Sequence, residues 1–505
     1  LKSAFVSPPV FCLVMSCLKW GVLCSALRFF CQASRVHASP GDALVFLQQE
    51  LRRPHETAEQ GSCHELPRPL HYDYGQFSGS YGWSTVDWSD DNFQYAAKLG
   101  RRGAYGQLAP LMQKLHRGET LKIAVFGGSA TAGSNCQQHG VTAKECSWPR
   151  RFQHWLQTAF PHAAVELTNF AQGGATSSSI LAGVGIMLEA AHRPDLIFLD
   201  TLVNDVYQFQ KDFLKRRSWQ SMVRDRATDC AMAFEQLLRS LHELEPQAVI
   251  FPILAGCEPC RERRSAQLDV MAHYGLPRLD WNDLTAWKKH LWDGPDYHPF
   301  YWAHQSIADV LATLWGSVWR EQCSSHFAKQ KELDWRTSYF KPEQLLEFRP
   351  CLKPLSAYDA SIPAFTKHVK LGPGWSLFED KPGKPGWISE TQESLIEFPL
   401  RFGKHPALVV TWMRSYEKLG YASLELNKHE ERLDGLWTDG AARKASLAHT
   451  RWFQADFAWA QQRDPEVALT GFNIMPFTNH TMQITIPTDP DLQYHKMKIM
   501  QVFSC

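Results

Sequence analysis

The sequence lacks an excess of either charge. Its 505 residues include 53 Lys and Arg against 52 Asp and Glu, which leaves a formal net charge of +1. Proteins that attract nucleic acid or an anionic membrane surface through a general field need a strong basic surplus. We therefore expect no nucleic-acid partner, and a substrate must be recognised by local contacts.

The sequence also lacks an uninterrupted apolar run that could cross a bilayer. Residues 10–30 are largely apolar, but Lys19 and Arg28 interrupt them, whereas a spanning helix needs ~20 consecutive apolar residues. The run fits a secretory signal that ends at Ala38, before Ser39. The sequence thus predicts a leader over residues 1–38, a secreted or secretory-pathway protein, and no stable membrane span in the mature chain. An amphipathic or plastid-type leader is the alternative.

Motifs for metals and phosphates are missing as well. Cys257 and Cys260 form a Cys-x-x-Cys pair, but no second such pair completes a four-cysteine zinc site. The glycines before Ser129 have neither the Lys of a phosphate-binding loop nor the spacing of a dinucleotide fingerprint. No set of histidines and acids has the spacing of metal ligands. The sequence therefore predicts neither a metal nor a cofactor.

The chain is rich in cysteine and aromatic residues. It has 13 Cys, 19 Trp and 29 Phe. Cys136 and Cys146 flank a short polar loop, so a disulfide is expected there if the protein is secreted. The sequon at Asn479 agrees with a secreted glycoprotein. Flat aromatic rings suit carbohydrate handling, although most such rings fill cores.

The middle of the chain alternates short apolar runs with longer segments of helical periodicity. Strands are expected over 121–126, 165–170, 195–203 and 248–254, and helices over 92–115, 148–160, 177–192, 228–244 and 302–315. This alternation predicts βαβ units and a mostly parallel sheet with helices on both faces. We assign residues 119–322 to this domain and residues 39–118 to an N-terminal extension.

A second domain follows. Residues 323–390 are charged and rich in proline, and we expect a linker with local structure. Beyond it, strands are expected over 394–402, 407–413, 421–427, 467–474, 481–486 and 496–503. Short strands separated by turns predict a β-sandwich over residues 391–505. Trp437 and Trp452 are its candidate sugar contacts.

The candidate chemistry lies at the carboxyl ends of the expected parallel strands, where ligands bind in such sheets. Ser129 follows the first strand, Gly174 the second and Asn204 the third, and His298 precedes the last helix. A serine hydroxyl needs a nearby base, and the developing oxyanion needs fixed N–H donors. We expect His298 to be the base, with His304 as its rival. The N–H groups of Ser129 and Gly174 and the amide of Asn204 are the candidate donors.

The order of these motifs resembles that of the SGNH hydrolase superfamily, relatives of the GDSL esterases and lipases. The motifs are Gly-Gly-Ser129, Gly174, Val-Asn204-Asp205 and His298-Pro. The resemblance covers residues 119–320. It implies a flavodoxin-like three-layer α/β/α fold, Ser129 as nucleophile, His298 as general base, and an oxyanion hole of Ser129, Gly174 and Asn204. The layout also resembles SGNH-like proteins of algae and other protists in which a β-rich domain follows the hydrolase.

Two departures from the family pattern stand out. Gly128 replaces the Asp of the Gly-Asp-Ser turn, which is not the acid of the triad. The family places that acid three residues before the His, where this chain has Pro295. Asp296 or Asp293 could still reach His298, and Asp296 is favoured because fewer residues separate them. A Ser-His dyad oriented by a backbone carbonyl is the third possibility.

The sequence thus predicts a serine esterase that removes acyl groups, acetyl above all, from a carbohydrate, glycoconjugate or small ester. An O-acyltransferase is the alternative within enzymes, because an acyl-serine can be passed to a sugar hydroxyl when water is excluded. A glycan-binding or adhesion protein with a degenerate hydrolase domain is the alternative outside them.

Overall fold

The computed structural model describes residues 66, 104–134, 136, 143–205, 226–254, 264–280, 298–299, 301–323, 333–345, 351–357, 363–380, 384–415, 418–436, 447–454, 472–490 and 494–505. Every described residue belongs to one compact unit, residues 65–505. The expected leader over residues 1–38 therefore lies outside the described residues. So does most of the expected N-terminal extension.

A five-stranded parallel sheet forms the first domain, in the order β2-β1-β3-β4-β5. Its strands are β1 (Leu121–Gly127), β2 (Val165–Asn169), β3 (Leu196–Asp200), β4 (Val249–Leu254) and β5 (Leu279–Asp280). The first four were predicted, whereas β5 has two residues and is too short for periodicity to reveal. The strand order is the flavodoxin-like one, so the predicted fold class is confirmed.

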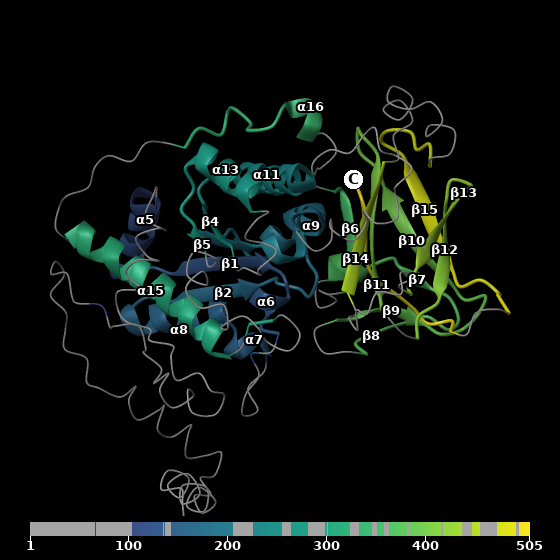
Figure 1. Ribbon diagram of the computed structural model, residues 1–505, viewed down its shortest axis with the longest axis horizontal. Coiled ribbons are helices and arrows are strands. Elements are labelled where there is room, and N and C mark those ends of the chain that lie inside the picture. The colour runs from purple at the N-terminus through teal and green to yellow at the C-terminus, as the bar shows by residue number, and fades with distance from the viewer. Residues whose placement is uncertain are drawn as a thin grey trace, which may run out of the picture. The chain divides into compact units, whose positions relative to one another are not determined.

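Helices cover both faces of this sheet, as Figure 1 shows. One layer packs into a shared core with the sheet and consists of α5 (Ala104–His116), α8 (Trp148–Ala159) and α15 (Tyr301–Cys323). The other layer consists of α9 (Ser177–Ala190), α11 (Arg226–Leu244) and α13 (Ser265–Tyr274). The helix α13 was not predicted, and α15 is longer than expected.

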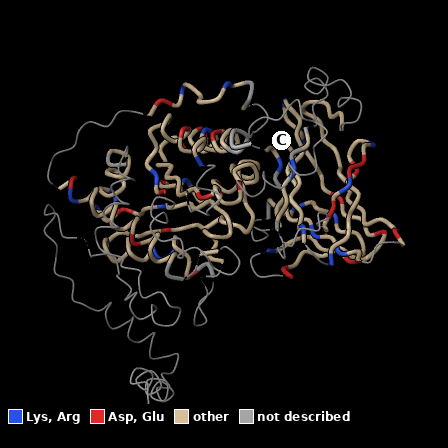
Figure 2. Tube along the Cα trace, viewed as in Figure 1, with Lys and Arg blue, Asp and Glu red and all other residues tan. Residues whose placement is uncertain are grey.

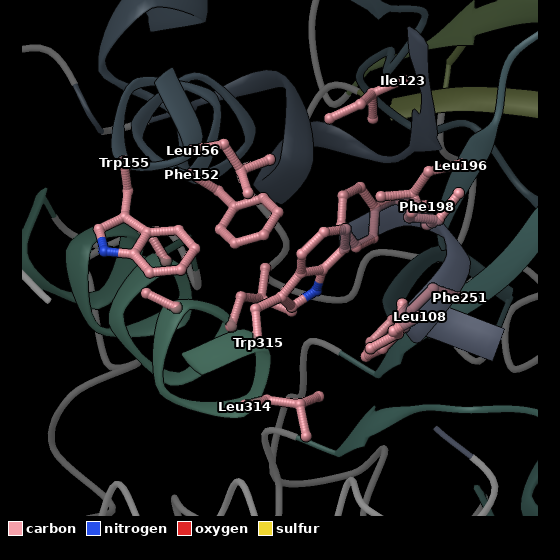
Figure 3. Packing of buried hydrophobic residues seen from close by; sticks show 14 of the residues in the cluster. Leu108, Ile123, Phe152, Trp155, Leu156, Leu196, Phe198, Phe251, Leu314 and Trp315 are labelled. Carbon is pink, nitrogen blue, oxygen red and sulfur yellow. The ribbon is translucent and has the colours of Figure 1, made fainter. Parts of the chain in front are cut away.

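Aromatic side chains fill the core between the sheet and α15. Phe152 of α8 lies edge-on to Trp315 of α15, with ring centroids 5.4 Å apart (Figure 3). The ring of Phe198 in β3 contacts Phe152 at 5.7 Å and Phe251 of β4 at 5.6 Å. Alternate residues of a parallel strand face opposite layers. The first four residues of β3 are accordingly apolar, and burial of both faces explains this continuous hydrophobic run.

The second domain contains two antiparallel sheets (Figure 1). One has the order β13-β12-β15-β10-β7 and the other β14-β11-β16-β9-β8, with β6 also paired to β16. Their bounds are β6 (Lys353–Ser356), β7 (Lys370–Leu371), β8 (Ser376–Phe378), β9 (Gly386–Ser389), β10 (Leu395–Arg401), β11 (Ala407–Arg414), β12 (Tyr421–Leu426), β13 (His429–Asp434), β14 (Leu447–Gln454), β15 (Asn479–Thr485) and β16 (Met497–Ser504). The predicted β-rich C-terminal domain is confirmed.

The second domain differs from the expectation in its details. Strands β6 to β9 lie within the expected linker of residues 323–390 and pair with strands of both sheets. Strands β13 and β14 were not predicted, and β13 is hard to recognise because its sequence is mostly charged. The strand expected over 467–474 falls mostly outside the described residues, as does Trp437. Trp452 lies in β14, opposite Val409.

The two sheets of the second domain are buried differently. Strand β10 alternates between buried and half-buried residues, as expected of a sheet with one covered face. In contrast, β11 and β16 are buried at every position. Their second face contacts the first domain, where Val409 and Phe503 cluster with Ala182 of α9. The sandwich is therefore packed against the α/β domain through this sheet.

Charges of both signs are interspersed along the described chain, as Figure 2 shows. No helix within the described ranges is long and apolar enough to cross a membrane. In the same ranges, no cluster of three or more His, Cys, Asp or Glu residues could hold a metal ion.

Candidate active site

A tight turn after β1 presents Ser129. Strand β1 ends at Gly127, and Ser129 is the first residue of the short helix α6 (Ser129–Ala132). The turn is tied to the end of β3 in two places. The Gly128 N–H donates to the Asp200 carbonyl at 3.1 Å, and the Thr131 hydroxyl donates to the Asp200 carboxylate at 2.5 Å. The serine thus lies between two central strands, at the point where strand order reverses.

His298 reaches this serine from far along the chain. Its Nε2 lies 2.7 Å from the Ser129 Oγ, within the range for a nucleophile and its base. His298 lies three residues before Tyr301, where α15 begins, so the packing of that helix on α8 and the sheet helps to position it. Both side chains are half-buried, which leaves Ser129 accessible to a substrate. The structure thus brings together two predicted residues that are 169 positions apart.

Gly174 occupies the turn after β2. Its φ of +87° lies in the left-handed region, which favours glycine. The turn is fixed to β1 because the Gln172 N–H donates to the Gly127 carbonyl at 3.0 Å. Among the described residues, the N–H groups of Gly174 and Ser129 have no acceptor. Both are therefore available to an oxygen of a substrate.

Asn204 completes the predicted set of donors. Its side-chain amide donates to the Ala175 carbonyl at 2.8 Å, which fixes its orientation and leaves its second N–H for another acceptor. The amide also lies directly over the serine turn: a Cβ built on Gly128 would come within 2.0 Å of the Asn204 Nδ2. Any residue other than glycine at position 128 would therefore displace the amide.

Asp205, the residue after Asn204, holds the start of a neighbouring helix. Its carboxylate accepts from the N–H and the hydroxyl of Ser177, both at 2.7 Å, and from the Gln267 amide at 3.0 Å. It thus caps the start of α9. Complete burial raises the pKa of the Asp205 carboxyl to about 6, although these hydrogen bonds act in the opposite direction.

The rival base His304 is held by a partner other than the nucleophile. It is fully buried in α15, and its Nδ1 accepts a hydrogen bond from the Trp148 N–H at 3.2 Å. Burial, together with the charge of Arg151, lowers the pKa of His304 to about 3. The imidazole is therefore neutral and is used to hold α8 against α15.

Asp293 and Asp296 lie outside the described residues, so the group that orients His298 stays a prediction. The sequence identified Gly174 and Asn204 by their positions after strands, and His298 by its position before a helix. Asp200 was not assigned a role from the sequence. The available signal for Asp200 was an acid at the carboxyl end of a buried apolar strand.

Disulfides lie near the site and in the second domain. Cys136 and Cys146 are bonded directly after the serine turn, as predicted. Cys351 is bonded to Cys505, which ties β6 to the last strand of the sandwich. No sequence pattern indicated this second pair. Cys257 and Cys260 lie outside the described residues.

Residues 125–305 match the family model of the GDSL-like lipase/acylhydrolase family. No curated protein matches the chain. Two similar solved structures are crystal structures of a two-domain esterase active on acetylated mannans, one of them co-crystallised with mannopentaose. Each is 16% identical to this chain, and the match covers 80% of this chain and 96% of the solved chain, with TM-scores of 0.53 and 0.52. These structures share the two-domain fold. Residues 125–305 therefore match a domain of the GDSL-like lipase/acylhydrolase family, the relatives of the SGNH hydrolases that the sequence resembles.

Proposed function

We propose that this enzyme removes acetyl groups from a carbohydrate or glycoconjugate, with Ser129 as nucleophile and His298 as general base. The observation that supports these roles best is the 2.7 Å approach of the His298 Nε2 to the Ser129 Oγ. The carbohydrate substrate is supported by the shared two-domain fold, because the solved esterase of that fold is active on acetylated mannans.

The first half of the reaction forms an acyl-enzyme. The Ser129 oxygen attacks the ester carbonyl while His298 takes its proton. The N–H groups of Ser129 and Gly174 and the Asn204 amide stabilise the oxyanion of the tetrahedral intermediate. His298 then protonates the departing sugar oxygen, and the acyl group remains on Ser129. In the second half, His298 deprotonates a water that attacks the acyl carbon, which releases acetate and restores the serine.

Chemical labelling and acetate release test the proposal. A fluorophosphonate is expected to label the purified full chain and to block release of acetate from acetylated mannan. Ser129→Ala should abolish both the labelling and the release of acetate, and His298→Ala should lower turnover by about 10⁴-fold or more. Ser376→Ala, at an exposed serine in β8, is the matched control and should retain both the labelling and the release of acetate.

Two results would overturn the proposal. Labelling that persists in Ser129→Ala would place the nucleophile elsewhere. Transfer of acetyl to an added mannan acceptor without release of acetate would make the enzyme an O-acyltransferase.

We further infer a secretory-pathway location. The expected leader over residues 1–38 and the bonded pairs Cys136–Cys146 and Cys351–Cys505 support it, because disulfides persist in oxidising compartments.

A further inference from the structure

The turn that presents Gly174 is held from outside its own domain. We call residues 172–175 the oxyanion turn. The Nε2 of Gln501, in β16 of the sandwich, donates to the Oε1 of Gln172 at 3.1 Å. Both side chains are buried, with exposed fractions of 3% and 7%. This hydrogen bond joins residues 329 positions apart and ties the last strand of the chain to the turn.

Gln501 is itself fixed within the sandwich. Its Nε2 also lies 3.4 Å from the hydroxyl of Ser356 in β6, and its backbone is in register with both β6 and β11. Two residues further along β16, Phe503 packs in the cluster that includes Ala182 of α9. The Gln501 amide therefore projects from a buried and rigid strand.

A second contact from the sandwich limits the same turn. A Cβ built on Gly174 would lie 2.8 Å from the Cβ of Ala448 in β14, which is closer than real Cβ atoms approach. Ala448 therefore packs against the backbone that carries the candidate oxyanion donor. Ala448 and Gln501 therefore both restrict the movement of the oxyanion turn.

Gln172 connects this contact to the proposed donors. Its N–H is bonded to β1, and its carbonyl accepts from the Ala175 N–H at 3.1 Å. The Ala175 carbonyl in turn accepts from the Asn204 amide. A shift of Gln172 would thus move both Gly174 and Asn204, the two proposed donors to the oxyanion that this turn connects.

We propose that Gln501 is a positioning residue for the ester-hydrolysing site, through which the sandwich domain fixes the oxyanion turn. The proposal depends on the proposed function, because it assigns Gly174 and Asn204 to the oxyanion. Donors that are preorganised act on the transition state more than on the bound substrate. Loss of the Gln501 contact should therefore lower kcat and leave KM almost unchanged.

The test compares three variants of the full chain with the wild type. Gln501→Leu removes the hydrogen bond at similar volume, Gln172→Leu removes it from the other side, and the double variant removes both partners. We expect each single variant to lower kcat by about 10-fold, less than the 10² to 10³ reported for complete loss of an oxyanion donor. KM should stay within about twofold. The kcat of the double variant should be little lower than that of either single variant, because the effects of removing two partners of one contact are not additive.

A matched control separates positioning from general destabilisation. Ser389 and Ser394 share a buried hydrogen bond of 2.9 Å whose two partners both lie in the sandwich. Ser389→Ala should lower the unfolding temperature and leave kcat unchanged. Fluorophosphonate inactivation, which forms a tetrahedral adduct with its oxygen in the oxyanion hole, should slow in the Gln501 variant by the same factor as kcat. A rescue variant, Gln501→Glu, keeps the side-chain length, and Gln172 can turn its amide to donate to it, so part of kcat should return.

The outcomes distinguish the two proposals. An active wild type with normal kcat in both single variants would overturn the positioning role and leave the esterase mechanism standing. A rise in KM alone would also overturn it, because it would assign Gln501 to ground-state binding. If Ser129→Ala retains full activity, the proposed function itself fails, whatever the Gln501 variants show.

Discussion

Position 128 is a glycine, and the Asn204 amide occupies the space that the Cβ of any other amino acid would need. The backbone of Gly128 does not itself require glycine, because its φ of −90° and ψ of −161° are open to any residue. The requirement comes from the approach of Asn204, whose Nδ2 would lie 2.0 Å from a Cβ. The family's Asp at this position is therefore incompatible with the arrangement of Asn204 in this chain.

This contact predicts that Gly128→Ala lowers kcat by about 100-fold. The methyl group displaces the Asn204 amide, and removal of one oxyanion donor costs a factor of this order. Steady-state kinetics on an acetyl ester measure the effect, and thermal unfolding checks that the variant is folded.

A double-mutant cycle identifies the cause of that loss. In an Asn204→Ala background the space above Gly128 is open, so Gly128→Ala should cost little further activity. If the two losses multiply instead, the effect of the methyl group does not act through Asn204.

At the scale of elements, the start of α9 is a capped and buried helix terminus. Thr176 and Ser179 form a reciprocal capping box, in which the Thr176 hydroxyl accepts from the Ser179 N–H at 3.2 Å. The Asp205 carboxylate adds two hydrogen bonds at Ser177. The helix follows the oxyanion turn directly, so its capping also fixes the end of that turn.

The buried carboxyl of Asp205 predicts a pH-dependent stability. Its pKa is raised from the usual 3.8 to about 6, so the folded state holds the proton more tightly than the unfolded state. The free energy of unfolding should therefore fall as pH rises from about 4 to about 6, by about 3 kcal/mol from this group. Denaturant unfolding of the wild type and Asp205→Asn across this range gives the contribution as the difference between the two curves.

The exposed Asp269 of α13 provides the control for loss of a carboxylate. Asp269→Asn should preserve the pH dependence of the wild type, whereas Asp205→Asn should reduce it. Parallel curves for wild type and Asp205→Asn would show that the buried carboxyl has no raised pKa.

Helices and strands could be predicted from the sequence where a single local pattern identifies the element. Strands β1 and β3 are short apolar runs followed by turn or polar residues, and burial on both sides makes that pattern clear. In contrast, β5 has two residues, and β13 is a charged strand at the end of its sheet's strand order. Such strands are defined by pairing with a neighbour, which local periodicity does not encode.

At the scale of the whole molecule, the disulfides Cys136–Cys146 and Cys351–Cys505 support the secretory-pathway location that we propose. The balanced charge supports recognition of the substrate through local contacts. The sequon supplies a third observation. Asn479 is exposed at the start of β15, so a glycan could be attached there without entering the core.

We predict that a eukaryotic secretory host releases the chain into the medium with a glycan on Asn479. Treatment with a peptide N-glycosidase should lower its mass, and Asn479→Gln should remove that difference. Asn473→Gln, at an asparagine of the same segment outside any sequon, is the matched control. Retention inside the cell with free thiols at Cys136 and Cys146 would contradict the prediction.

The sequence by itself determined the alternation of strands and helices and the order of Ser129, Gly174, Asn204 and His298 along the chain. These features follow from periodicity and from turn residues, which act over a few neighbouring positions. It also indicated the Cys136–Cys146 pair, because the two residues flank one loop.

Only the tertiary structure decided which of these residues meet. It placed His298 on Ser129, laid Asn204 over Gly128 and joined Gln501 to Gln172. These contacts depend on how packed layers bring distant segments together. No local pattern records such an approach, so the part of the site that depends on the sandwich domain could not be predicted from the chain alone.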